Sequence, residues 1–83
     1  MYEVRVTRSA LKDISSLPKN YAELISRHID SLDVTPRPQG VKRLQGRQDF
    51  SLRVDMYRIL YEIDDDYQVV TIFRVKHRRE VYR

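Results

Sequence analysis

Basic side chains are concentrated at the C-terminal end of the chain, and their type suits the binding of phosphate groups. Residues 74–83 hold Arg74, Lys76, Arg78, Arg79 and Arg83 against Glu80 alone. In residues 1–73 the basic and acidic residues are equal in number, so the net charge of +4 lies in the last ten residues. Such a cluster creates a positive potential suited to a polyanion or to an acidic protein segment, unless it is only a solvated tail.

A second group of basic residues lies in the stretch just before this end. If Asp55 and Met56 form a two-residue hairpin turn, Arg53 lies directly opposite Arg58 on the neighbouring strand. Like charges in this position destabilise a sheet, and a bound anion between them would offset the cost. Guanidinium groups match phosphate oxygens in a bidentate way, so the pair predicts a phosphodiester site. The alternative is that a nearby carboxylate neutralises the pair, namely that of Asp49, Asp55 or Glu62.

His77 is the one histidine that stands among these cations. Its cationic neighbours favour the neutral imidazole, which can accept a proton near neutral pH, so we expect a general base here. His28 has no such neighbours in sequence. Because the chain has two distant histidines, no cysteine and only two glycines, we expect no metal site, no thiolate chemistry, no glycine-rich phosphate loop and no cofactor.

The elements that position these residues follow from periodicity. Residues 1–7 alternate apolar and polar side chains as a strand does, and residues 10–17 and 21–33 carry apolar residues at helical spacing. Ser9 is the expected cap of the first helix and Asn20 that of the second, and Pro18 separates the two. Residues 51–54, 57–63 and 67–75 read as three strands joined by short turns.

This order predicts an α+β fold, in which an N-terminal strand and an antiparallel helical hairpin precede a three-stranded antiparallel meander. We expect both helices to pack on one face of a four-stranded sheet. Residues 41–46 are ambiguous, either a loop or the irregular start of a strand. The predicted register places the apolar residues on the helix-facing side, and Arg53, Arg58, Arg74 and Lys76 on the other. The expected apolar set is Phe50, Leu52, Val54, Tyr57, Ile59, Tyr61, Val69, Phe73 and Val75.

The length of 83 residues suits one domain, 1–83, and the sequence has no apolar run long enough for a membrane span and no signal peptide. We therefore expect a cytoplasmic protein that does not interact with membranes.

Four motifs in the second half of the chain resemble a known family. They are Leu44-Gln45-Gly46, Leu52-Arg53-Val54, the run Tyr57-Arg58-Ile59-Leu60-Tyr61-Glu62-Ile63, and Val75-Lys76-His77-Arg78-Arg79-Glu80-Val81-Tyr82. Together with the N-terminal strand and helix pair, they resemble the RelE/ParE superfamily of toxins from type II toxin-antitoxin pairs. The resemblance covers nearly the whole chain.

The RelE-like branch implies a metal-independent endoribonuclease that cuts mRNA in the ribosomal A site. In the implied reaction the ribose 2′-hydroxyl attacks the adjacent phosphate and leaves a cyclic phosphate. By position, Arg58 resembles the arginine that stabilises the transition state, Arg78 the C-terminal catalytic arginine, and Arg53 a basic residue on the preceding strand. Tyr82 resembles a terminal tyrosine that stacks on RNA or transfers a proton, and His77 an acid or base; the resemblance leaves open which of these two is the base.

The remaining basic residues expected to contact RNA are Arg74, Lys76 and Arg79, together with Arg47. The sequence has Ser51 and Leu52 where the RelE-like branch carries a further lysine, so that this cationic contact is either missing or supplied by Arg47. The ParE-like branch implies an alternative, inhibition of DNA gyrase without a nuclease site. Either branch implies a cognate antitoxin that covers the basic face or the helix pair and through which operator DNA is bound, and the RelE-like branch adds ribosome and mRNA as partners.

Overall fold

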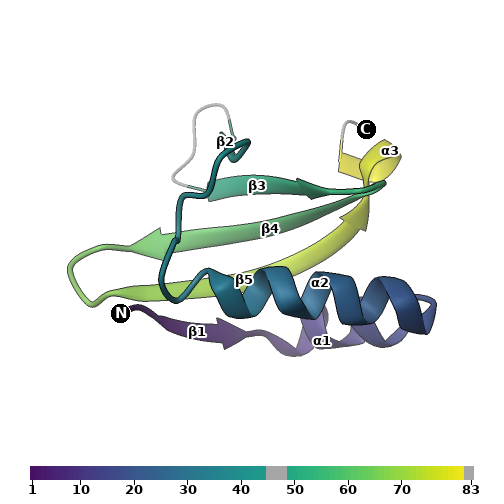
Figure 1. Cartoon of the computed structure of the whole chain (residues 1–83), viewed down its shortest axis with the longest axis horizontal. Helices are drawn as coiled ribbons and strands as arrows, with labels where there is room; N and C mark the ends of the chain where they lie inside the picture. The colour runs from purple at the N-terminus through teal and green to yellow at the C-terminus, as the bar shows by residue number, and fades with distance from the viewer. Residues whose placement is uncertain (45–48, 82–83) are drawn as a thin grey trace.

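The computed structural model of the chain describes residues 1–44 and 49–81, without the side chains of Glu80 and Val81. Its elements, in chain order, are β1 (Glu3–Val6), α1 (Arg8–Ser15), α2 (Lys19–Ser31), β2 (Lys42–Arg43), β3 (Asp49–Val54), β4 (Tyr57–Asp64), β5 (Val69–His77) and α3 (Arg78–Val81). The strands form one sheet in the order β1-β5-β4-β3-β2 (Figure 1). The predicted α+β class and the meander of β3, β4 and β5 are confirmed.

The sheet has five strands rather than the four expected. The additional strand is β2, in which Lys42 pairs with Ser51 and Arg43 with Phe50 in antiparallel register. A two-residue strand has too short a pattern to be recognised by alternation. β1 joins the other edge of the sheet and runs parallel to β5.

The hairpin between β3 and β4 has the register that the two-residue turn predicts. Val54 pairs with Tyr57, and Arg53 pairs with Arg58. The turn residue Asp55 has a φ of 57°, in the left-handed region that aspartate tolerates better than most residues. An aspartate can therefore stand where such turns usually carry glycine.

A β-bulge changes the register between β4 and β5. Tyr61 pairs with Ile72 and Leu60 with Arg74, so that Phe73 is the extra residue. The bulge moves Val70 and Ile72 into the core, where both are fully buried. The prediction that Val69 and Phe73 face the core is therefore wrong, because it assumed an uninterrupted alternation along β5.

The two long helices are antiparallel to each other, as expected (Figure 1). The cap of α1 is Thr7 rather than Ser9, and its hydroxyl accepts a hydrogen bond of 3.2 Å from the backbone N–H of Ala10. At the start of α2, Pro18 occupies the cap position and supplies no side-chain hydrogen bond, so Asn20 does not cap this helix. The proline correctly predicted the break between the helices, but both helices begin and end about two residues earlier than expected, and their caps depend on the local backbone.

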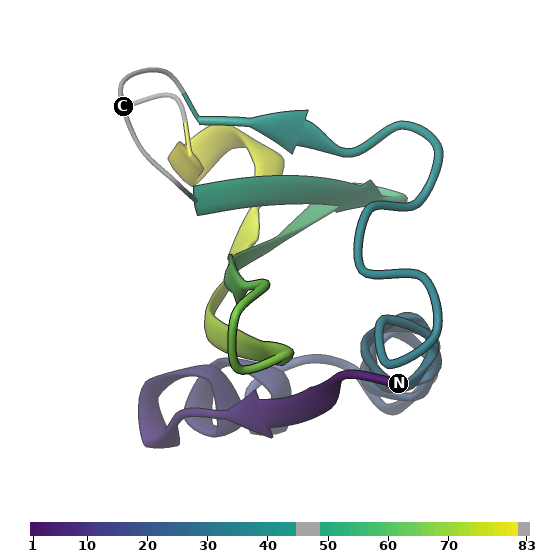
Figure 2. The same cartoon turned by 90° about the vertical axis from the view of Figure 1, so that its left-hand side faces the viewer.

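The three helices lie on different sides of the sheet. β1 and then α1 follow one edge of β5, α2 lies across one face, and α3 lies on the other face (Figures 1 and 2). The core forms between α2, α1 and the sheet. Its buried apolar residues are Ala10, Ile25, Ile29, Leu32, Phe50, Leu52, Val54, Ile59, Tyr61, Val70, Ile72 and Val75. Within residues 1–44 and 49–81, no helix is long and apolar enough to cross a membrane.

Candidate functional site

Three cations lie side by side on the sheet face that carries α3. Arg53 of β3 is opposite Arg58 of β4, and Arg58 is opposite Lys76 of β5. We call Arg53, Arg58 and Lys76 the cation row. Arg58 is only 5% exposed, whereas Arg53 is exposed and Lys76 half-buried. A buried guanidinium between two other cations acts in a medium of low dielectric, where its interaction with a phosphate is stronger than in water.

The hydrogen bond of the Arg53 side chain bears on whether a carboxylate neutralises this one residue of the row. The Nε of Arg53 donates to the backbone carbonyl of Asp55 at 3.1 Å, not to a carboxylate. This bond folds the Arg53 side chain back over the β3–β4 turn and leaves its charge exposed. Ser51, two residues earlier on the same face, is buried, and its Oγ makes no hydrogen bond among the residues described.

α3 brings two further arginines to the same end of the sheet. The backbone N–H of Arg78 donates to the carbonyl of Met56 at 2.7 Å, which attaches the start of α3 to the β3–β4 turn. Arg78 and Arg79 are both exposed, and α3 lies on the face opposite to α2 (Figure 2). The structure thus brings five of the predicted residues to one end and one face: Arg53, Arg58, Lys76, Arg78 and Arg79.

His77 is not part of this arrangement. It pairs with Tyr57 on the sheet face that α2 covers, and the two rings meet edge to face with centroids 5.7 Å apart. Tyr57 in turn contacts Tyr21 of α2, with a centroid distance of 5.3 Å. The Nδ1 of His77 accepts a hydrogen bond of 3.3 Å from the backbone N–H of Arg79. His77 and Lys76 are successive residues of β5 and start out toward opposite faces, but both also line a small hollow at this end of the strand, together with Asp13 and Tyr57.

Arg74 is also drawn away from the cation row. Its Nε and one terminal nitrogen donate to the two carboxylate oxygens of Asp13 in α1, at 2.9 and 3.3 Å. The expectation that Arg74 joins the outward basic face is therefore wrong for its guanidinium, although its backbone position is as predicted. Sequence reasoning missed Asp13, because no local signal links a helix carboxylate to a strand 61 residues away. Two other predicted site residues, Arg47 and Tyr82, lie outside the described residues.

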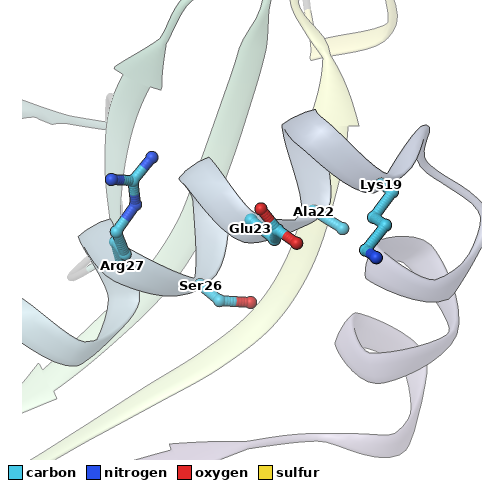
Figure 3. A pocket seen from close by; sticks show the side chains of 5 residues that line it. All are labelled: Lys19, Ala22, Glu23, Ser26 and Arg27. Carbon is cyan, nitrogen blue, oxygen red and sulfur yellow. The ribbon is translucent and has the colours of Figure 1, made fainter.

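A second hollow lies on α2, away from the cation row. It is an open groove of about 620 Å³ lined by Lys19, Ala22, Glu23, Ser26 and Arg27 (Figure 3). The small side chains of Ala22 and Ser26 leave the space, and the charged residues follow one another at four-residue spacing along the helix. Such charges are common on solvated helix faces. Across residues 1–44 and 49–81 there is no group of three or more His, Asp or Glu side chains that could hold a metal ion.

The fold and the cation row together define a class: a small α+β domain in which one sheet face carries a row of cations. Comparison with known proteins makes the class specific. Residues 4–82 match the family model described as the ParE toxin of the type II toxin-antitoxin system parDE. The chain is also 35% identical, over 99% of its length and 97% of the other protein, to the toxin RelG of Mycobacterium tuberculosis.

Solved structures agree with this match. The toxin-antitoxin complex RelBE2 of M. tuberculosis contains a chain with a TM-score of 0.81 and 35% identity, over 93% of this chain and 98% of that one. The archaeal RelE–RelB complex of Pyrococcus horikoshii OT3 gives a TM-score of 0.83 and 26% identity, over 93% and 94%. The protein belongs to the RelE/ParE superfamily of type II toxin-antitoxin toxins.

Proposed function

We propose that this toxin is a metal-independent endoribonuclease that cuts mRNA on the ribosome. The observation that carries the proposal is the cation row, in which Arg58 is buried between Arg53 and Lys76. Cations gathered on one sheet face create a positive potential that attracts a polyanion, and guanidinium groups match phosphate oxygens in a bidentate way. The similarity to proteins named RelG and RelE supports the RelE-like branch.

The chemistry that these cations support is attack of the ribose 2′-hydroxyl on the adjacent phosphate. The bond from the 2′-oxygen to phosphorus forms as the bond from phosphorus to the 5′-oxygen breaks, which gives a 2′,3′-cyclic phosphate and a free 5′-hydroxyl. Negative charge builds up on the phosphate oxygens in the transition state, and prearranged cations stabilise it. In this proposal Arg58 binds those oxygens with Lys76, and Arg78 approaches from α3.

The reaction also needs a group that takes the proton of the attacking 2′-hydroxyl. His77 points to the face that α2 covers and packs on Tyr57, so the proposal assigns the proton transfer to Tyr82. Arg53, which is exposed at the margin of the row, then contacts a neighbouring phosphate of the RNA and contributes to binding more than to turnover.

The test uses purified toxin, translating ribosomes and a short mRNA of known sequence. Primer extension is expected to map new 5′ ends inside the A-site codon, and treatment of the 3′ ends with a cyclic-phosphate-opening phosphatase is expected to make them ligatable. Naked mRNA serves as the control, because a ribosome-dependent enzyme leaves it intact. Uncut mRNA on translating ribosomes would overturn the proposal.

A second candidate function is inhibition of DNA gyrase. The observation that favours it is the family model, whose description names the ParE toxin. The same protein preparation is therefore added to a supercoiling assay. Inhibited supercoiling with intact ribosome-bound mRNA would establish this alternative.

We also propose that a cognate antitoxin covers the cation row with an acidic segment, since both solved relatives named above are toxin-antitoxin complexes. The product of the reading frame adjacent to the toxin gene is the antitoxin to test. Its affinity for the toxin is expected to fall when Arg53 is replaced by glutamate. The groove on α2 is the other available surface, so the matched variant is Ala22→Arg, which fills that groove (Figure 3). Lost binding with Ala22→Arg alone would place the antitoxin on the helices instead.

A further inference from the structure

The edge of β5 changes partners at the β-bulge. β1 pairs with β5 only from Val69 to Ile72. Beyond that point the backbone groups on this edge of β5 form hydrogen bonds with α1 and its capping residue. The carbonyl of Ile72 accepts from the N–H of Thr7 at 3.0 Å, and the carbonyl of Phe73 accepts from the Thr7 hydroxyl at 3.4 Å. The capping residue of α1 thus also closes the strand edge.

Asp13, about two turns further along α1, accepts a hydrogen bond from the last of these backbone groups on the edge of β5, the N–H of Val75. Its Oδ2 accepts a hydrogen bond of 2.9 Å from the backbone N–H of Val75 and another of 2.9 Å from the Nε of Arg74. The Asp13 side chain is only 17% exposed. Burial by itself raises the pKa of this carboxyl, but the hydrogen bonds from Arg74 and Val75, together with the positive charges of Arg74 and Lys76, outweigh it and lower the pKa below its usual value. Asp13 therefore stays ionised throughout the neutral range.

The residues that Asp13 holds lie between the bulge and the cation row. Phe73 is the bulged residue, Arg74 and Val75 carry the two bonds to Asp13, and Lys76 is the next residue and lies opposite Arg58. A bulge interrupts the ladder locally and leaves the strand less constrained.

We infer that Asp13 is a positioning residue for the cation row: its bonds to Val75 and Arg74 set where Lys76 and α3 stand relative to Arg58. This inference rests on the proposed nuclease function for its kinetic consequence. Asp13 does not touch the RNA. It acts through β5, and it also holds the charge of Arg74 away from the row.

Three variants separate the hydrogen bond from the Val75 amide from the ion pair with Arg74. Asp13→Ala removes both, Asp13→Asn keeps an oxygen that can accept from Val75 but loses the charge, and Arg74→Met keeps the Val75 bond and loses the ion pair. Cleavage of ribosome-bound mRNA is measured at a temperature where each variant is folded. We expect Asp13→Ala to lower kcat by about 10- to 100-fold with KM changed less than about threefold, because a small displacement of a catalytic group is costly. Asp13→Asn and Arg74→Met are expected to lie between this variant and the wild type.

The matched control is Asp30→Asn, an exposed aspartate of α2. It is expected to leave kcat and KM as in the wild type. If Asp13→Ala lowers the melting temperature but leaves kcat unchanged, the residue has only a structural role and the inference fails.

A second measurement does not depend on nuclease activity. In the free toxin, NMR is expected to show that Asp13→Ala increases hydrogen exchange at the Val75 amide at least tenfold and shifts the amide resonances of Lys76 and Arg58. Unchanged exchange and unchanged resonances would overturn the inference even if the wild-type protein cuts no mRNA. Conversely, wild-type toxin that cuts no mRNA, together with altered resonances in Asp13→Ala, removes the proposed function and leaves the positioning of Lys76 established.

Discussion

Charged side chains are arranged in opposite ways at the two ends of the sheet. At the end formed by the β3–β4 turn, the cation row places like charges next to one another. At the other end, the carboxylate of Asp65 accepts a hydrogen bond of 2.6 Å from the hydroxyl of Tyr2. It also accepts hydrogen bonds of 3.1 and 2.9 Å from the two terminal nitrogens of Arg37. We call Tyr2, Arg37 and Asp65 the Asp65 cluster. There the charges are complementary and join three separate segments of the chain.

The difference shows which end serves folding and which serves binding. Next to the Asp65 cluster, the guanidinium of Arg37 stands 5.3 Å from the centre of the Phe50 ring, and the buried hydroxyl of Tyr61 donates to the carbonyl of Pro36 at 2.9 Å. These contacts attach the loop after α2 to the sheet. Substitutions at this end should therefore change stability and spare activity, whereas substitutions in the cation row should do the reverse.

The largest effect is expected from Arg58→Ala. Loss of the buried guanidinium should reduce cleavage of ribosome-bound mRNA by about 10²- to 10³-fold, as loss of one prearranged transition-state donor does, equivalent to about 3–4 kcal/mol. Arg58→Lys keeps the charge without the bidentate fork and should recover part of that activity. Arg37→Ala is the matched control from the Asp65 cluster and should cleave normally. Equal losses in both alanine variants would contradict the division between the two ends.

Tyr61→Phe should come next, with an effect on stability alone. It removes the hydrogen bond to the Pro36 carbonyl and should lower the free energy of unfolding by about 1–2 kcal/mol in urea denaturation. Burial raises the pKa of Tyr61 to about 12, so in absorbance titration this phenol should ionise after the exposed tyrosines. Tyr67→Phe, at an 83% exposed position, is the control and should leave stability unchanged.

A smaller effect is expected at Asp65, which is largely exposed. Hydrogen bonds from Arg37 and then Tyr2 hold the pKa of Asp65 below its usual value. A carboxyl with a lowered pKa in the folded state adds stability above its unfolded pKa, near 4, and this contribution disappears as the pH falls through the folded value. The wild type should therefore lose its thermal advantage over Asp65→Asn between pH 5 and the acid range. An advantage that persists below pH 2 would contradict the assignment.

The smallest effect on cleavage is expected from His77→Gln. Because the imidazole faces α2 and packs on Tyr57, its loss should change kcat less than about threefold. A pH–rate profile with the same shape as that of the wild type would agree with the position of His77 on the face that α2 covers. A loss comparable to that of Arg58→Ala would instead bring His77 into the reaction.

Much of the fold was accessible from the sequence because it depends on local spacing. The alternation in residues 57–63 and the short Asp55–Met56 turn predicted the hairpin register, and with it the opposition of Arg53 and Arg58. The proline at position 18 predicted the break between the helices. The caps were mispredicted, since Thr7 and Ser9 have similar capping chemistry and only the backbone conformation distinguishes them.

The sequence by itself determined that two arginines meet across a hairpin and that cations follow at the end of the chain. Only the tertiary structure decided which of these cations act together. The bulge at Phe73, the bonds from Arg74 and Val75 to Asp13, and the packing of His77 on Tyr57 all arise from contacts between segments far apart in the chain. Periodicity carries information over a few residues, whereas the direction of a side chain at a strand end depends on what packs against it.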